Sequence, residues 1–200
     1  MKEEILYRKA TLLDVDAIMT LVQLRIDWMN TVGLHQWNET DYFGRYPRSY
    51  WERNIESFLV GELKGKVVVV TALYTEDVRW TRDGEYTGSA SGAAYYIHHL
   101  ATDPAVKGAG VAMMRYVEQY AVEHGIHLLR LDSAIGNKVL ERYYTKLGYT
   151  PCGTCHDRLY HGILREKALP IGIGVPGPFH GAKDLGNHLV EGIVEAAKLC

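Results

Sequence analysis

The sequence lacks the features that mark membrane proteins and nucleic-acid-binding proteins. No apolar run approaches the roughly 18 residues that a membrane span needs, and residues 1–5 contain no apolar signal core. The net charge is only −2, which gives no electrostatic reason to expect a nucleic acid or an acidic membrane as a partner. With 200 residues, 47% of them hydrophobic, the chain is long enough for one well-packed domain. We therefore expect a cytoplasmic globular protein.

Cysteine is also scarce, with three residues at positions 152, 155 and 200. An odd number argues against a disulfide framework. The run Cys152-Gly-Thr-Cys-His156 matches the haem-attachment pattern Cys-x-x-Cys-His, but covalent haem attachment normally accompanies export. A zinc site would need a second spaced pair of ligands. We interpret Cys152 and Cys155 as strand thiols beside a turn, and we predict no metal site.

The most informative segment is residues 100–112, LATDPAVKGAGVA, which has the pattern of a strand end, a glycine-bearing turn and a helix start. Gly108 and Gly110 carry no Cβ, so the backbone there can approach a ligand closely. The free N–H groups and the positive dipole end of the following helix face the same point. Together with Lys107 at the entrance, they predict a pyrophosphate cradle. An ordinary strand-to-helix turn is the alternative, because neither the three-glycine dinucleotide fingerprint nor a Gly-Lys-Ser/Thr phosphate loop is present.

The next residues continue the alternation of helix and strand. Apolar side chains recur at helical spacing over residues 111–124, and Gly125 is placed to end that helix. Residues 126–132 have the pattern of a buried strand. A short helix is predicted over residues 137–147, closed by Gly148.

This block resembles the GCN5-related N-acetyltransferase (GNAT) superfamily. The cofactor motif of that family, Gln/Arg-x-x-Gly-x-Gly/Ala, corresponds here to Lys107-Gly108-Ala109-Gly110-Val111-Ala112, with lysine in place of the usual arginine or glutamine. The later signature of the family is an asparagine, a tyrosine seven residues on, and then a glycine and an aromatic residue. Asn137, Tyr144, Gly148 and Tyr149 occupy those positions.

The resemblance implies an α/β fold with a mixed, mostly antiparallel twisted sheet, flanking helices and splayed central strands. We assign residues 1–167 to this domain and residues 168–200 to a C-terminal extension, made of a Gly/Pro-rich loop and a candidate helix. The sequence patterns predict strands over 5–9, 58–63, 66–74, 93–102, 150–155 and 159–167, helices over 12–30 and 48–57, and a long mobile hairpin loop over 76–92.

The resemblance also implies acetyl transfer from acetyl-CoA to an amine by direct attack through a tetrahedral intermediate. The pantetheine arm would pair with the backbone of Leu100, Ala101 and Thr102 like an added strand. Asn137 would hydrogen-bond the arm, although it also suits the N-cap of its helix. The pyrophosphate would meet Lys107 and the N–H groups of Gly108, Ala109, Gly110, Val111, Ala112 and Met113.

Two catalytic groups follow from the same comparison. Tyr144 occupies the usual acid position of the family, and a phenol can donate a proton to the departing thiolate; the alternative is that Tyr143 or Tyr144 is a core residue. Candidates for the base are His98, His99 and Asp132. We favour His98, because arylalkylamine acetyltransferases have a histidine there and imidazole titrates near neutral pH. Asp132 matches an acidic position of ribosomal-protein acetyltransferases. Two alternatives remain: an ordered water chain could take the proton in place of a dedicated base, and either histidine could be a hydrogen-bonded core residue.

The acceptor is less clearly indicated by the sequence. A small-molecule primary amine is the first expectation, and a protein N-terminus or lysine is the second. A CoA-binding sensor without turnover would keep Gly108 and Gly110 but would need neither Tyr144 nor His98. A homodimer is a candidate assembly, and the helix of the C-terminal extension would pack on the body of the domain or on a second subunit.

Overall fold

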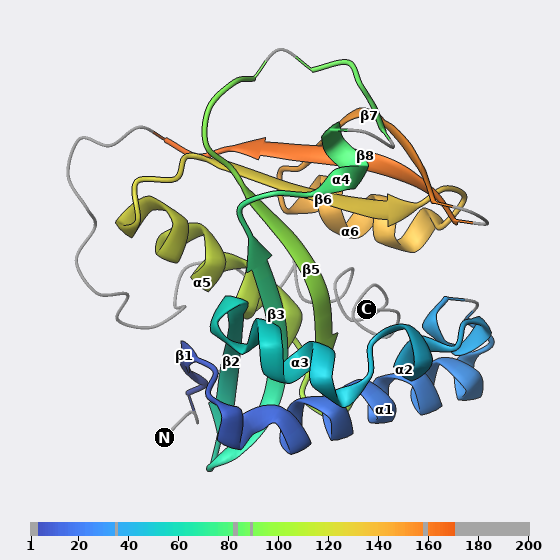
Figure 1. The fold of residues 1–200 in the computed structure, drawn as a ribbon, viewed down its shortest axis with the longest axis vertical. Coiled ribbons are helices and arrows are strands. Elements are labelled where there is room, and N and C mark those ends of the chain that lie inside the picture. The colour runs from blue at the N-terminus through green and yellow to red at the C-terminus, as the bar shows by residue number, and fades with distance from the viewer. Residues whose placement is uncertain (1–3, 35, 82–83, 89, 158–159, 171–200) are drawn as a thin grey trace.

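The fold was obtained as a computed structural model, which describes residues 4–34, 36–81, 84–88, 90–157 and 160–170. In this part of the chain, one 8-stranded sheet has the order β1-β2-β3-β5-β6-β8-β7-β4, and helices lie against it (Figure 1). All strand pairs are antiparallel except β5 with β6. The expected α/β fold with a mixed, mostly antiparallel sheet is therefore confirmed. The strands are β1 (Leu6–Lys9), β2 (Phe58–Leu63), β3 (Lys66–Tyr74), β4 (Gly84–Tyr86), β5 (Tyr95–Thr102), β6 (Leu128–Ala134), β7 (Thr150–Asp157) and β8 (Tyr160–Ala168).

Two layers of helix enclose the sheet. The helices are α1 (Val15–Val32), α2 (Tyr42–Arg45), α3 (Arg48–Asn54), α4 (Val78–Thr81), α5 (Ala109–Glu123) and α6 (Lys138–Lys146). Strand residues alternate between two faces, so Val60 and Val70 pack in one core with α1 and α3, whereas Leu59 and Val69 pack in a second core with α5. No helix among the described residues is long and apolar enough to cross a membrane.

The hairpin of β2 and β3 forms where the sequence predicts it. Lys64 and Gly65 join the strands, and both have positive φ angles, 54° and 74°. This pair of angles is the signature of the type I′ turn, whose twist matches that of the flanking strands. The two strands that result place their valines on both faces of the sheet, and they support β5 at the centre of the molecule.

The segment 76–92 differs from the expected mobile hairpin loop. It contains α4 and β4, and β4 pairs with β7 at the edge of the sheet. The cause is packing at long range: Trp80 on α4 is 6% exposed and contacts the rings of Tyr86 and Tyr96. The local sequence, rich in glycine and serine, gives no sign of these contacts. The prediction of a loop is therefore wrong for α4 and β4.

The candidate helix of the C-terminal extension lies outside the described residues, because residues 171–200 are not among them. The other sequence predictions match the elements to within two residues at most ends. Helix α5 begins at Ala109, two residues before the expected start, because Gly108 adopts a left-handed conformation with φ 80° and serves as its N-cap.

The central strands β5 and β6 are splayed, as expected. They run parallel and are in register only at Tyr95 with Leu129 and at Tyr96 with Arg130. Beyond these pairs the two strands diverge (Figure 1). A register shift between β3 and β5 marks the same region, and His99 there has a positive φ of 53°. β5 turns away from β6 at this bulge, and the space between the two separating strands is called the cleft.

The start of helix α1 gives a test of stability against pH. Asp14 closes a capping box with Thr11, and the hydrogen bond from Arg8 lowers its pKa to about 2. A carboxylate with a lowered pKa contributes stability above its unfolded pKa, near 4, and loses that contribution as the pH falls towards 2. We expect Asp14→Asn to lower the free energy of unfolding by about 1 kcal/mol at pH 7.

The measurement is urea unfolding of the wild type and the variant at pH 7 and at pH 2.5. The difference between the two proteins should shrink at the lower pH, because the wild type then loses part of the charge on Asp14. Asp16→Asn is the matched control, since Asp16 is an exposed carboxylate on the same helix whose ion pair with Arg48 is also exposed and contributes little to stability. An equal loss of stability for both variants would contradict the assignment to the capping box.

Candidate active site

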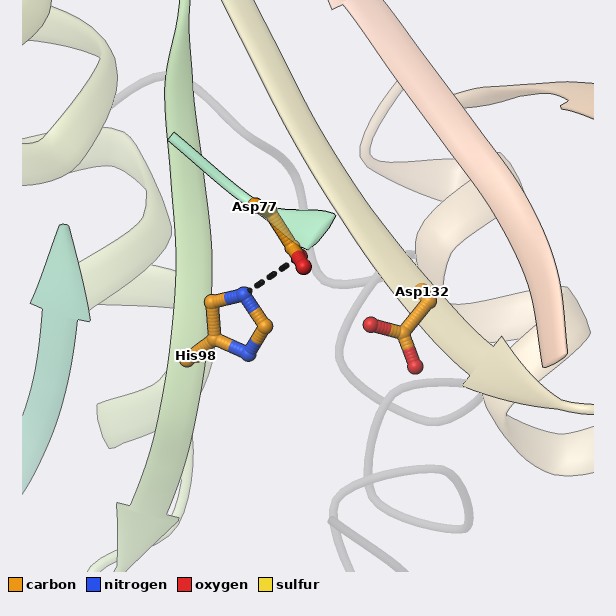
Figure 2. Close-up of side chains that lie close together, drawn as sticks. All are labelled: Asp77, His98 and Asp132. Atoms are coloured by element: carbon orange, nitrogen blue, oxygen red, sulfur yellow. Dashed lines mark hydrogen bonds and ion pairs between the residues drawn. The ribbon is translucent and has the colours of Figure 1, made fainter. Parts of the chain in front are cut away.

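Two carboxylates and one imidazole lie together in the cleft between β5 and β6. They belong to Asp77, Asp132 and His98. His98 lies on β5 and Asp132 on β6, and Asp77 precedes α4. One imidazole nitrogen of His98 and one carboxylate oxygen of each aspartate all lie within 4.8 Å of one another. Figure 2 shows His98 and Asp132 on opposite strands with Asp77 beside the imidazole. The structure thus brings together His98 and Asp132, two of the three side chains that the sequence nominates for catalysis, and adds Asp77 to them.

His98 is bound to Asp77 by a short contact. The Nε2 atom of His98 lies 2.8 Å from Oδ2 of Asp77, and their side chains are 17% and 7% exposed. Burial raises the pKa of Asp77, but the hydrogen bond with His98 and the charges of His98 and Arg79 outweigh it, so that the pKa of Asp77 is lowered. Asp77 is therefore ionised near neutral pH and accepts the hydrogen bond.

Asp132 is held by two partners on the other side of the cleft. Its Oδ1 accepts a hydrogen bond from Arg79, with a distance of 3.1 Å, and its Oδ2 accepts one from the hydroxyl of Tyr160. Burial and the charge of Asp132 raise the pKa of Tyr160, so this phenol stays protonated and acts as the donor. Both oxygens of Asp132 are thus engaged with neighbours from α4 and β8.

His99, the neighbour of His98 on the same strand, contacts tyrosine hydroxyl groups, whereas His98 contacts a carboxylate. Its Nδ1 and Nε2 atoms lie 2.7 and 2.8 Å from the hydroxyl oxygens of Tyr42 and Tyr50. Enclosure of the ring, with the nearby charges of His98 and Arg79, lowers the pKa of His99 to about 3. His99 is therefore a neutral histidine that organises an aromatic core. Of the two histidines, His99 is the one that fits the alternative of a core histidine whose ring nitrogens are hydrogen-bonded.

A hollow lies at the N-terminus of α5, below the cleft. The first N–H groups of a helix have no partner inside it, and its dipole favours an anion. Nothing lies within 4 Å of the place that a Cβ on Gly108 would occupy, but its φ of 80° favours glycine there. A Cβ on Gly110 would come within 3.0 Å of the hydroxyl of Tyr143. The residues that line the hollow are Thr102, Asp103, Pro104, Val106, Lys107, Gly108, Ala109, Gly110, Val111 and Tyr143.

The nominated cofactor residues fall into two groups. Thr102, Lys107, Gly108, Ala109, Gly110 and Val111 line the hollow, whereas Leu100, Ala101, Ala112, Met113, Asn137 and Tyr144 are not among its lining residues. Met113 is fully buried in the core of the α5 face, and the N–H of Ala112 already donates to the carbonyl oxygen of Gly108. Ala101 and Thr102 pair with β3 at Val70 and Val69. On the side that faces β6, no strand pairs with β5 after Tyr96 among the described residues.

Tyr143 and Tyr144 point in different directions on α6. Tyr143 is 3% exposed and its hydroxyl group reaches the hollow beside Gly110. Tyr144 is partly buried and contacts the ring of Tyr149 at 6.0 Å between centroids. The expectation that the two rings cannot face the same side agrees with this arrangement. The role of Tyr144 as the acid stays a prediction.

Asn137 begins α6 as its N-cap. Its Oδ1 accepts hydrogen bonds from the N–H groups of Val139 and Leu140, at 3.2 and 3.0 Å. The alternative of an N-cap is therefore present in the structure, and a contact of its amide nitrogen with a ligand stays a prediction. Because the cap fixes the first turn of α6, it also fixes the direction in which Tyr143 and Tyr144 leave that helix.

The two cysteines of the Cys-x-x-Cys-His run are buried strand residues. Cys152 and Cys155 lie on β7 and are 8% and 0% exposed. Burial raises the pKa of Cys152 to about 11 and that of Cys155 to about 12, so both remain thiols at neutral pH. The interpretation as strand thiols agrees with these positions.

The sequence does not nominate Asp77, Arg79 or Tyr160 for catalysis. Asp77 and Arg79 come from the segment expected to be a mobile loop, and Tyr160 begins β8. One local signal exists: Asp77 accepts a hydrogen bond from the N–H of Arg79, 2.9 Å away, as an aspartate at the start of a helical turn often does. That signal predicts a turn and does not predict a partner for His98.

The acetyltransferase (GNAT) family model matches residues 22–149. This range is more than half of the chain and includes the glycine turn, the cleft strands and Tyr144, and the chain belongs to this family. The expected resemblance is thereby confirmed. A search of curated proteins finds no match.

Solved structures share the fold at low sequence identity. An acetyltransferase of the GNAT family from Streptococcus agalactiae 2603 is 19% identical, with a TM-score of 0.69 over 83% of this chain and 96% of that one. One from Listeria monocytogenes 4b F2365 is 22% identical, with a TM-score of 0.65 over 84% and 96%. The PaiA N-acetyltransferase from Thermoplasma acidophilum, in complex with coenzyme A, is 16% identical, with a TM-score of 0.61 over 82% and 99%.

Proposed function

We propose that this protein transfers the acetyl group of acetyl-CoA to the primary amine of a small molecule. One observation carries the proposal: β5 and β6 separate after Tyr96 and Arg130, with His98 and Asp132 on the two sides of the gap and the N-terminus of α5 nearby. A thioester arm and an amine can meet in such a gap, each approached by different residues. The family assignment supports the same chemistry.

The cofactor fits the residues on the β6-facing side of β5 and at the start of α5. The N–H groups at the α5 N-terminus would hold the pyrophosphate, and Lys107, which is exposed at that place, would add a positive charge. The edge of β5 that faces β6, at Leu100, Ala101 and Thr102, would hydrogen-bond the pantetheine arm. When bound, acetyl-CoA supplies an acetyl thioester with a thiolate as its leaving group. The Thermoplasma acidophilum protein of this fold was crystallised with coenzyme A, which supports this choice.

The residues of the cleft supply the proton transfers. His98 accepts a proton from the ammonium group of the acceptor, because only the neutral amine is nucleophilic. An N–H group of the β5 bulge, at Leu100 or Ala101, stabilises the charge that develops on the carbonyl oxygen. Tyr144 donates a proton to the sulfur as the carbon–sulfur bond breaks.

The charges around the cleft support an amine as the acceptor. Asp77 and Asp132 are carboxylates close to His98, and Arg79 pairs with Asp132. A cationic amine is therefore attracted, and it loses its charge only beside His98. The ring of Tyr74 lies 5.5 Å from that of His98, measured between centroids, and would offer aromatic surface for the rest of a small acceptor. Its hydroxyl lies 2.7 Å from that of Tyr50.

The test is a calorimetric titration of acetyl-CoA into the purified protein and into Gly110→Asp. The variant places a carboxylate at the helix N-terminus, beside Tyr143, so we expect its Kd to rise at least about tenfold. Thiol release with a panel of small amines, peptides with free N-termini and lysine peptides then identifies the acceptor. Absence of binding to the folded wild type would refute the proposal, and turnover only with peptides would replace the small-molecule acceptor.

A further inference from the structure

The hydrogen bond between Asp77 and His98 determines which nitrogen of His98 can act as the base. A carboxylate has no proton to donate, and Asp77 accepts hydrogen bonds from His98 and from the N–H of Arg79, which favour its ionised form and lower its pKa. A neutral imidazole at 2.8 Å from Oδ2 must therefore carry its proton on Nε2, the atom that faces Asp77. The lone pair of the neutral ring then lies on Nδ1.

The Nδ1 atom is placed to use that lone pair. No hydrogen bond to Nδ1 of His98 is formed within the described ranges of the chain, although its neighbour His99 has both ring nitrogens bound. Figure 2 shows the second nitrogen of His98 directed away from Asp77 and into the space beside Asp132. One imidazole nitrogen of His98 lies within 4.8 Å of a carboxylate oxygen of Asp132, so the two side chains face the same space between the strands.

We propose that Asp77 is a positioning residue that fixes His98 as the Nε2–H tautomer, so that Nδ1 is the atom that takes the proton of an amine bound between His98 and Asp132. The inference rests on the proposed acetyl transfer for its use, but the tautomer is a property of the protein alone. Asp77 touches neither substrate nor cofactor in this arrangement, and it acts through His98.

The proton balance of the reaction follows from this arrangement. Nδ1 takes one proton from the ammonium group, which leaves a neutral amine and an imidazolium ring stabilised by the carboxylate of Asp77. The amine lone pair forms the nitrogen–carbon bond, the carbon–sulfur bond breaks, and the sulfur receives a proton from Tyr144. The second proton lost by the amine nitrogen restores Tyr144, and the imidazolium returns its proton to solvent. One proton is released in each turnover.

Several other charged or titratable groups surround His98 and bear on its protonation. The ring of Tyr74 on β3 lies at 5.5 Å and that of His99 on β5 at 6.2 Å, measured between centroids. Arg79 on α4 opposes a positive charge on the imidazole, whereas Asp132 on β6 favours it. Since Arg79 and Asp132 pair with one another, their effects partly cancel, and Asp77 is the carboxylate in direct contact.

The direct test is the tautomer itself, read from ¹⁵N–¹H correlation spectra of histidine-labelled protein at a pH where His98 is neutral. His98→Gln assigns the signals. We expect the Nε2–H pattern in the wild type, and a mixture or the Nδ1–H form in Asp77→Asn, because asparagine can donate to Nε2 as well as accept from it. The near-equal size of asparagine keeps the fold, and Glu76→Gln is the matched control, since Glu76 is the adjacent and exposed carboxylate.

The second readout is kinetic. In Asp77→Asn we expect kcat to fall about 10- to 100-fold, with the acidic limb of the pH–rate profile displaced to lower pH, because the imidazolium loses its carboxylate. The Kd of acetyl-CoA should stay unchanged, and Glu76→Gln should match the wild type in all measurements. A purely structural role for Asp77 would lower the melting temperature without moving the limb of the profile.

The two hypotheses fail in different ways. An Nδ1–H tautomer in the wild type, or the same tautomer in the wild type and in Asp77→Asn, overturns the positioning role of Asp77 whether or not the protein has turnover. Absence of acetyl-CoA binding, with the Nε2–H tautomer present and lost in Asp77→Asn, refutes the proposed function and retains the assignment of the dyad.

Discussion

Replacing His98 with glutamine is expected to lower kcat for acetyl transfer by about 10²- to 10⁴-fold, the range that a positioned general base contributes. The glutamine amide can still donate a hydrogen bond to Asp77, so the fold of the cleft should persist. It has no nitrogen that gains a proton near neutral pH. The acidic limb of the pH–rate profile should therefore disappear along with the rate. Steady-state kinetics across pH 5.5–9.5 and a calorimetric titration of acetyl-CoA make the measurement.

The matched comparison is Asp132→Asn, on the other side of the cleft. Both oxygens of Asp132 already accept hydrogen bonds, from Arg79 and from Tyr160, so we expect this residue to attract the amine and leave its deprotonation to His98. The variant should raise KM for the amine and keep the acidic limb. A loss of the limb in Asp132→Asn, with His98→Gln near wild type, would transfer the base to Asp132. An unchanged rate in both variants would favour a water chain.

The distinction between His98 and His99 shows how far sequence reasoning reaches into this site. Alternation along a strand predicts that only one of the two faces the cleft, and that is the arrangement observed, with His99 bound to Tyr42 and Tyr50. The sequence does not show the bulge that separates them. That bulge depends on the register between β3 and β5, which is set by contacts between residues far apart in the chain.

The glycine turn could be placed from the sequence because its physical requirement is local. Gly108 has the positive φ with which α5 begins, and a Cβ on Gly110 would lie only 3.0 Å from the hydroxyl of Tyr143. Asp77 and Tyr160 could not be placed in this way. Each contacts its partner across the sheet, Asp77 with His98 and Tyr160 with Asp132, and no spacing rule links residues in different strands of an unknown register.

The same difference between local and long-range requirements explains which parts of the fold the sequence predicts. The β2–β3 hairpin is specified by two turn residues between alternating strands, and α1 by a capping box and the glycine that follows it. Segment 76–92 contains many glycines and serines, which are typical of loops. Its structure depends on the burial of Trp80, which Arg130 also contacts through its guanidinium group at 4.9 Å from the ring centroid. Long-range packing thus supplies the element that carries Asp77 and Arg79 to the cleft.

Replacing Tyr144 with phenylalanine tests the proposed general acid, which protonates the leaving group. The thiolate of the leaving group needs a proton, and a phenol positioned near it can supply one. Loss of the hydroxyl should lower kcat by about 10²- to 10³-fold. The apparent Kd of acetyl-CoA should change little, because the N-terminus of α5 holds the cofactor. Single-turnover kinetics with the acceptor found in the amine panel separates the chemical step from product release.

Tyr143→Phe is the control that the chain offers, since it removes one hydroxyl from the adjacent residue of the same helix. Tyr143 is 3% exposed and its hydroxyl lies at the Gly110 turn, so its loss should affect cofactor affinity or stability more than the rate of transfer. A fall in kcat for Tyr143→Phe with Tyr144→Phe unchanged would assign the acid to Tyr143. Equal binding and no turnover in the wild type, Tyr143→Phe and Tyr144→Phe would instead identify the protein as a CoA-binding sensor, for which neither hydroxyl has a catalytic use.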